Sequence, residues 1–254
     1  MVHHRPAATK PPYLIPSMAE IEAIPDCGLR VASTFSGCGG SCLGFTMEGF
    51  RIPWACEFVA HAASTYEDNF PKTEVCTEDI RQVEVGQILE ACAVDKGGLD
   101  VLEGSPPCQS FSMAGKRQLT WGKVRDHGDH RQRDDDLFME FARLVKGLRP
   151  RAFVAENVAG LVRGVAKGWF KEILRTLKSC DYVVEAKLLD AQWLGVPQSR
   201  QRVIFQGIRA DLGAAPTWPK PLSYRYSVRE AMVDLPGWDQ LHEMDVVHRA
   251  GRWL

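Results

Sequence analysis

One cysteine in this chain follows two prolines at the end of an apolar run. Residues 104–112 read Gly-Ser-Pro-Pro-Cys-Gln-Ser-Phe-Ser, and the cysteine is Cys108. Residues 100–103 are typical of a buried strand, which the prolines end because they cannot donate to a central ladder. The thiol is therefore expected at a strand's exit, where open parallel sheets carry their chemistry. Taken alone, Cys108 has a second interpretation as a small buried hydrophobe, the commoner role of a free cysteine.

A glycine cluster and two acids predict a cofactor pocket. Residues 34–40 read Thr-Phe-Ser-Gly-Cys-Gly-Gly between a predicted strand and a helix, where glycines let a ligand approach the backbone. Glu57 ends the second predicted strand, 20 residues after Gly37, and Asp79 follows another possible strand end, in residues 77–80. A carboxylate at such a strand end can bind ribose hydroxyls. Because the spacing differs from the dinucleotide fingerprint, the pattern favours an adenosine-bearing cofactor without a pyrophosphate, and the alternative is a plain tight turn.

Further ionisable residues flank two later strands. Glu156 follows the apolar run 152–155, and a carboxylate there is costly unless it is paired or functional. It should share a sheet edge with Cys108 if both strands are parallel. Arg200 and Arg202 precede the run 203–205, and strand alternation would aim them the same way. Two surface arginines are the simpler interpretation of that pair by itself.

The segment 115–133 is locally basic. Its charged residues are Lys116, Arg117, Lys123, Arg125, Arg131 and Arg133 against Asp126 and Asp129, an excess of +4. Charge-rich segments are usually solvated loops. The alternative is a loop that meets the phosphates of a nucleic acid.

Composition sets the broad class. The chain has 254 residues, of which 45% are hydrophobic and 25% charged, with a formal net charge of −1, as in an ordinary globular protein. Its eight cysteines lack the paired spacing of a zinc site, so we expect free thiols, no metal and a cytoplasmic location. No apolar run is long enough to predict a membrane span, and residues 1–10 do not form a secretory signal.

Apolar runs and amphipathic stretches alternate along most of the chain. Strands are predicted at 30–35, 52–57, 100–104, 152–155, 182–188 and 203–207, and helices after residue 40, up to residue 66, and at 134–148 and 168–180. This order predicts an α/β fold of three layers around a mostly parallel sheet.

Three regions follow from the same pattern. Residues 1–28 are interpreted as an N-terminal arm, with a capping-box helix near residues 17–22. Residues 29–210 form the predicted α/β domain, which contains the candidate cofactor and cysteine motifs. Residues 211–254 are a proline-rich extension, with a helical candidate at 228–233.

The motifs occur in the order of a known family. Six motifs follow one another between residues 29 and 210. They are Phe-x-Gly-x-Gly-Gly, the acid after the second strand, Asp-Ile, Pro-Pro-Cys-Gln-x-Phe-Ser, Glu-Asn-Val and Gln-x-Arg-x-Arg. With these motifs the chain resembles the DNA cytosine-5 methyltransferases, in their bacterial or phage-encoded form. The resemblance implies a Rossmann-like methyltransferase fold and S-adenosylmethionine as the cofactor.

The resemblance also implies catalytic roles. Cys108 matches the nucleophile that adds to carbon 6 of a flipped cytosine, which makes carbon 5 reactive toward the methyl group. Glu156 matches the residue at ring nitrogen 3 and the exocyclic amine. Arg200 matches the residue that holds the base carbonyl, and Arg202 is expected to support it. No residue is identified as the base that removes the carbon-5 proton.

On the cofactor side, the resemblance implies Phe35 near the adenine, Gly37 and Gly39 under the methionine portion, Glu57 on the ribose and Asp79 at the adenine amine. The remaining residues expected at the cofactor are Gly40, Phe58, Ile80 and Pro106.

Double-stranded DNA is the implied substrate, with Gln109, Ser112, Lys116 and Arg117 expected to contact it. Family members carry a target-recognition region and a closing Gly-Asn segment beyond the part matched here, and neither is found. We therefore expect a subunit whose second polypeptide supplies recognition, a truncated gene product or an expressed catalytic fragment. The alternatives are a catalytically silent cofactor-binding or scaffold protein and an RNA cytosine-5 methyltransferase.

Overall fold

A computed structural model of the chain describes residues 10–107, 125–126, 131–132, 137–162 and 166–232. Predictions for Cys108, Gln109, Ser112, Lys116 and Arg117 therefore lie outside the described residues.

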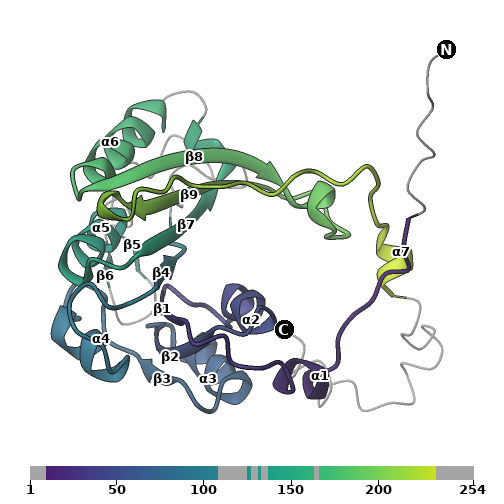
Figure 1. Ribbon diagram of the computed structural model, residues 1–254, viewed down its shortest axis with the longest axis horizontal. Coiled ribbons are helices and arrows are strands. Elements are labelled where there is room, and N and C mark those ends of the chain that lie inside the picture. The colour runs from purple at the N-terminus through teal and green to yellow at the C-terminus, as the bar shows by residue number, and fades with distance from the viewer. Residues whose placement is uncertain (1–9, 108–124, 127–130, 133–136, 163–165, 233–254) are drawn as a thin grey trace.

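A seven-stranded sheet runs through the domain in the order β3-β2-β1-β4-β7-β9-β8 (Figure 1). The strands are β1 (Arg30–Thr34), β2 (Arg51–Cys56), β3 (Glu74–Cys76), β4 (Val101–Gly104), β7 (Ala152–Val158), β8 (Tyr182–Asp190) and β9 (Gln201–Arg209). The first five strands of the chain in this sheet pair in parallel, and β9 is antiparallel to both of its neighbours. The predicted mostly parallel α/β sheet is confirmed.

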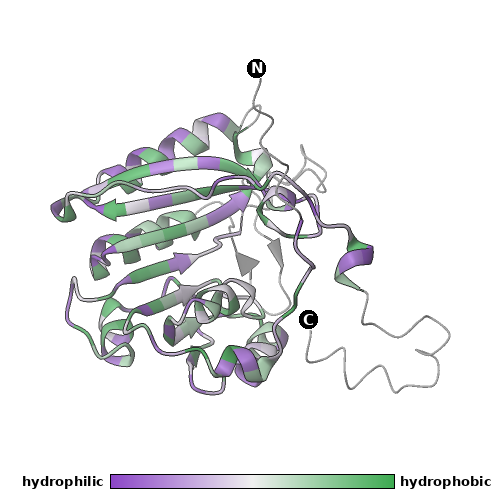
Figure 2. Cartoon of the chain, turned by 45° about the vertical axis from the view of Figure 1, so that its right-hand side comes forward, coloured by the Kyte–Doolittle hydropathy of each residue, from purple (hydrophilic) through white to green (hydrophobic). Residues whose placement is uncertain are grey.

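Helices cover both faces of the sheet. The helices are α2 (Gly40–Met47), α3 (Ala60–Asn69), α4 (Val85–Ala91), α5 (Leu137–Leu148) and α6 (Lys167–Lys178). Neighbouring residues of β1 point to opposite faces of the sheet. Val31 packs with Cys42 of α2 and Tyr66 of α3 on one face. Ala32 belongs to the larger core on the other face, which includes residues of α4, α5 and α6. Figure 2 shows apolar residues along the strands and polar residues on the outer helix surfaces. This alternation produces the three layers.

Shorter elements complete the described chain. They are α1 (Met18–Glu22), α7 (Val228–Ala231), the 3-10 helices η2 (Ala159–Val162), η4 (Ala191–Leu194) and η5 (Ala210–Leu212), and the paired two-residue strands β5 (Arg125–Asp126) and β6 (Arg131–Gln132). The predicted capping box of α1 is confirmed. Helix α4 was not predicted, because only one of its seven residues, Ile88, is buried, which leaves little periodic signal.

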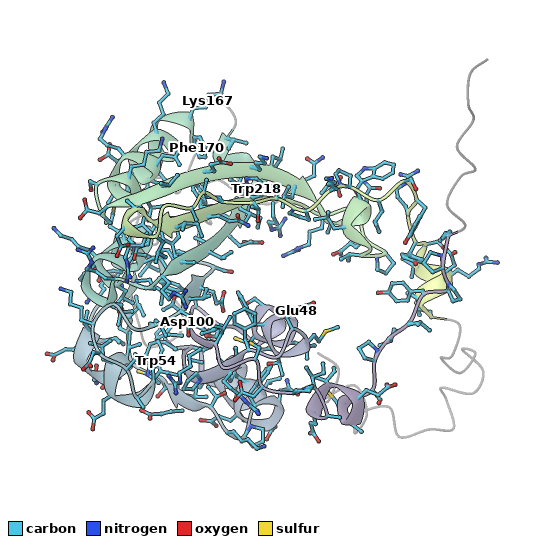
Figure 3. The ribbon with its side chains drawn as sticks, viewed as in Figure 1. Glu48, Trp54, Asp100, Lys167, Phe170 and Trp218 are labelled. Carbon is cyan, nitrogen blue, oxygen red and sulfur yellow. The ribbon has the colours of Figure 1, made fainter. Side chains whose placement is uncertain are left out.

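The N-terminal arm meets the extension that follows β9. The hydroxyl of Tyr226 donates to the carbonyl of Pro11 at 3.0 Å, and the rings of Tyr13 and Tyr226 lie 4.9 Å apart. Trp218 lies along β8, where its indole donates to Glu185 at 2.7 Å (Figure 3). Residues far apart in the sequence thus hold the extension against the domain.

Two kinds of feature are absent from the described residues. None of the helices there is long and apolar enough to cross a membrane. No group of three or more His, Cys, Asp or Glu side chains with the geometry of a metal site occurs in this part of the chain.

Gly104→Ala is expected to destabilise the fold by about 1–3 kcal/mol through overpacking. A Cβ atom there would lie 2.2 Å from Oγ1 of Thr34 and 3.0 Å from the ring of Phe141. The matched control is Gly86→Ala in α4, where a Cβ atom meets nothing within 4 Å. That change should stabilise the helix by about 0.5–1 kcal/mol. Urea unfolding measures both, and equal effects would contradict the packing argument.

Candidate active site

The candidate site lies at one edge of the sheet. Strands β1, β2, β3, β4 and β7 run parallel, so their carboxyl ends point the same way. The glycine turn follows β1, Glu57 follows β2, Asp79 follows β3, and Pro106 follows β4. Glu156 lies two residues before the end of β7, which extends three residues beyond its predicted end. The structure therefore brings these predicted residues to a common edge.

The glycine turn has an unusual backbone. Phe35 has a positive φ of 54°, a conformation that is an outlier for a bulky side chain and is often found at functional sites. Gly39 has a φ of 91°, and a Cβ atom there would lie 2.3 Å from the Phe70 ring. By contrast, a Cβ atom at Gly37 would meet nothing within 4 Å, so the turn has open space on that side. Gly40, the first residue of α2, is exposed.

Glu57 connects this turn to the end of β2. The amide of Gly37 donates to Oε2 of Glu57, and the amide of Val59 donates to Oε1, each at 2.8 Å. Both bonds orient the carboxylate, which still has lone pairs for a ligand. Phe58, the next residue, is half-buried.

Asp79 and Ile80 differ in exposure. The amide of Arg81 donates to Oδ1 of Asp79 at 3.0 Å, and its guanidinium lies 3.1 Å from Oδ2. The carboxylate is half-buried. The side chain of Ile80 is 4% exposed and packs in the core, so only its backbone can face the edge.

The Pro-Pro segment is tied to β7 by an amide side chain. Asn157, which is 2% exposed, donates from Nδ2 to the carbonyl of Pro106 at 3.1 Å. Its Oδ1 accepts from the amide of Val158 at 2.8 Å. Asn157 had no predicted role, although a polar pair, Glu156 and Asn157, directly after an apolar run indicates a special site. This bond fixes the backbone two residues before Cys108.

Glu156 pairs with both arginines. Nε of Arg202 lies 2.6 Å from Oε1 of Glu156, and Nη2 of Arg200 lies 3.9 Å from the same oxygen. Arg202 is closer because it belongs to β9 and is paired with Val158, two residues from Glu156 on the same face of the sheet. Its Nε is not aligned as a hydrogen-bond donor, so the contact is an ion pair. Arg200 precedes β9, and half of its side chain is exposed.

A second residue that the sequence analysis missed is Glu103 in β4. It is 4% exposed and accepts from Oγ of Ser41 at 2.9 Å and from Oγ of Ser33. Burial raises the pKa of Glu103, and its hydrogen bonds from Ser33 and Ser41 oppose that shift. An acid inside an apolar strand was the signal in the sequence.

The extension also reaches this region. Arg225 lies 4.8 Å from the ring centre of Trp193 and donates to Gln192 at 3.0 Å. With Gln198 and Ser199, these residues line a cavity of about 650 Å³. The cavity therefore adjoins the loop that carries Arg200.

Glu103→Gln is expected to change how folding stability depends on pH. Because burial raises the pKa of Glu103, the folded chain binds this proton more tightly than the unfolded chain. As the pH rises above about 4.3, the ordinary pKa of glutamic acid, the free energy of unfolding of the wild type should fall until the pH exceeds the raised pKa. The free energy of unfolding of the variant should fall less over the same range. Urea unfolding of both proteins between about pH 5 and pH 8 tests this, and parallel pH curves would contradict it.

Comparison with known proteins identifies relatives of this chain. Residues 29–247 match the family model described as C-5 cytosine-specific DNA methylase. The type II methyltransferase M.NgoPII of Neisseria gonorrhoeae is 35% identical over 76% of this chain and 51% of that protein. The type II methyltransferase M.AquIA of Picosynechococcus is 36% identical over 82% of both chains.

A solved structure shows the same fold. The crystal structure of a prophage-encoded Escherichia coli protein, assigned as a DNA modification methyltransferase, matches 82% of this chain and 55% of that one, with a TM-score of 0.66 and 30% identity. The chain spans about half the length of the first curated relatives it matches, which are longer than M.AquIA. With the family model matched over most of its length, the chain belongs to the C-5 cytosine-specific DNA methylase family.

Proposed function

We propose that this chain is the catalytic part of a DNA cytosine-5 methyltransferase that uses S-adenosylmethionine. The observation that carries the proposal is the common sheet edge, where a strained glycine turn, two strand-end acids and a paired Glu156 surround the segment leading to Cys108. The family is S-adenosylmethionine-dependent, and its sequence motifs occur here in the family order.

The cofactor fits the residues of this edge. Open space beside Gly37 gives a ligand access to the turn, and the oriented carboxylate of Glu57 can accept from ribose hydroxyls. Asp79 and the backbone of Ile80 would contact the adenine, beside Phe35. The other residues of this proposed site are Gly39, Gly40, Phe58 and Pro106. When bound there, the cofactor supplies the methyl group.

The residues of the chain would activate the base. The Cys108 thiolate adds to carbon 6 of cytosine, and Glu156 stabilises the charge that develops at ring nitrogen 3. Arg202 keeps the Glu156 carboxyl in place through their contact, while the more exposed Arg200 holds the base carbonyl. Once carbon 5 carries the methyl group, loss of its proton lets the thiolate leave and restores the aromatic ring.

DNA contacts are proposed for Gln109, Ser112, Lys116 and Arg117 next to the nucleophile. The positive charges of Lys116 and Arg117 would meet phosphates while the target cytosine is flipped out of the duplex. We retain the division into an arm at 1–28, a catalytic domain at 29–210 and an extension at 211–254. A location in a prokaryotic or phage-infected cytoplasm follows from the same proposal.

The region that reads the DNA site is proposed to come from the part of the longer relatives that this chain does not span. We expect weak or no methyl transfer to duplex DNA by residues 1–254 alone. Adding a C-terminal half with a recognition region and closing segment, as a second polypeptide or by fusion, should restore it. Tritium transfer from labelled S-adenosylmethionine measures both cases, with duplex DNA and transfer RNA as alternative substrates. Strong sequence-specific methylation by the lone chain would contradict the need for a second part.

Cys108→Ser is expected to reduce methyl transfer in the complemented enzyme by at least about a thousandfold, because a hydroxyl is a far poorer nucleophile than a thiolate. Affinity for S-adenosylhomocysteine, measured by calorimetry, should stay unchanged. The matched control is Cys27→Ser, which changes an exposed thiol in the arm and should leave activity intact. An active Cys108→Ser enzyme would show that another residue attacks the base.

A further inference from the structure

Glu103 lies beneath the glycine turn with its polar atoms turned toward the turn and α2. The parallel register pairs it with Ser33 of β1, whose hydroxyl donates to Oε1 of Glu103. The Ser41 hydroxyl donates to the same oxygen at 2.9 Å, and Sγ of Cys42 lies 3.7 Å from it. One buried oxygen thus receives three donors from β1 and from the first turns of α2.

These contacts continue to the acid after β2. The hydroxyls of Ser33 and Ser36 lie 2.7 Å apart, the amide of Ser36 donates to the carbonyl of Cys56 at 3.1 Å, and the Ser36 hydroxyl lies 3.3 Å from the same carbonyl. Cys56 precedes Glu57, which accepts from Gly37 in the same turn. A polar chain therefore runs from β4, which leads to the Pro-Pro-Cys segment, through the turn to Glu57.

Folding stability alone gives little reason for an acid here. Apart from Ser33, the neighbours on this face of the sheet include the apolar Val31 and Ala55, and Tyr66 of α3 packs in the same cluster. Replacing a buried ionisable group by an apolar side chain of similar size is often neutral or stabilising. A fully bonded polar network, however, selects one arrangement of the segments that it joins.

We propose that Glu103 is a positioning residue that determines the affinity of the chain for S-adenosylmethionine. By binding the hydroxyls of Ser33 and Ser41, it fixes the position of the glycine turn relative to Glu57 and the end of β4. This inference rests on the proposed function for the identity of the ligand. Glu103 acts through the turn and is not assigned a contact with the cofactor.

The test compares Glu103→Met with Glu103→Gln. Methionine has a similar size but removes the acceptor, whereas glutamine keeps one carbonyl oxygen in the place of Oε1. We expect Glu103→Met to weaken binding of S-adenosylhomocysteine about tenfold, as the loss of one or two hydrogen bonds would. Glu103→Gln should retain most of the affinity. Calorimetry on the full chain, well below each midpoint of thermal unfolding, measures the dissociation constants.

Thr34→Val is the matched control. The Thr34 hydroxyl donates to the backbone carbonyl of Glu103 at 3.0 Å from the opposite face of β1, so its loss perturbs the same strands without touching the network. This variant should bind the ligand as the wild type does. Equal affinities of Glu103→Met and the wild type, or equal losses in Glu103→Met and Thr34→Val, would overturn the inference.

A second variant keeps the test decisive if Glu103→Met does not fold. Ser41→Ala removes one donor to Oε1 and should weaken binding about threefold. Wild-type affinity in Ser41→Ala would overturn the inference. If the wild type itself binds neither S-adenosylmethionine nor S-adenosylhomocysteine, the proposed cofactor is wrong, an outcome separate from any effect of the variants.

Discussion

Parallel pairing of β1 with β2 and β4, and of β4 with β7, is the constraint on which the candidate site depends. It sends the carboxyl ends of these strands to one edge, so residues from 35 to 156 meet there although they are distant in sequence. The cost is a sheet buried on both faces, which needs helices on either side. Helices α2 and α3 on one face and α4, α5 and α6 on the other meet that need.

Buried and half-buried polar groups concentrate where the strands end. Asn157 holds the backbone of Pro106, Glu103 gathers the hydroxyls of β1 and α2, and Glu57 accepts from the glycine turn. An unpaired polar group in such a place would cost about 1–3 kcal/mol, so each of these bonds restricts the edge to one geometry. The rigid edge is the kind of scaffold that a methyl transfer reaction requires, because reacting groups must be held closely aligned.

Much of this arrangement could be predicted from local patterns. The apolar runs of β1, β2, β4 and β9, the capping box of α1 and the periodicity of α5 are local features, and each predicted element is present. Helix α4 was not predicted because it has a single buried residue, and one residue shows no helical periodicity. The roles of Asn157 and Glu103 were not predicted for a different reason. A polar residue inside an apolar run indicates that its side chain needs a hydrogen-bond partner, but the sequence does not indicate which residue that partner is.

Fold class, family and motif order can be inferred from the sequence, because they depend on residue types at set spacings. Which side chains lie in contact depends on the tertiary structure. It placed Arg202 closer than Arg200 to Glu156, through the antiparallel register of β7 and β9. It also joined Ser33 to Glu103 across 70 residues, because strand register brings distant residues to the same level of the sheet.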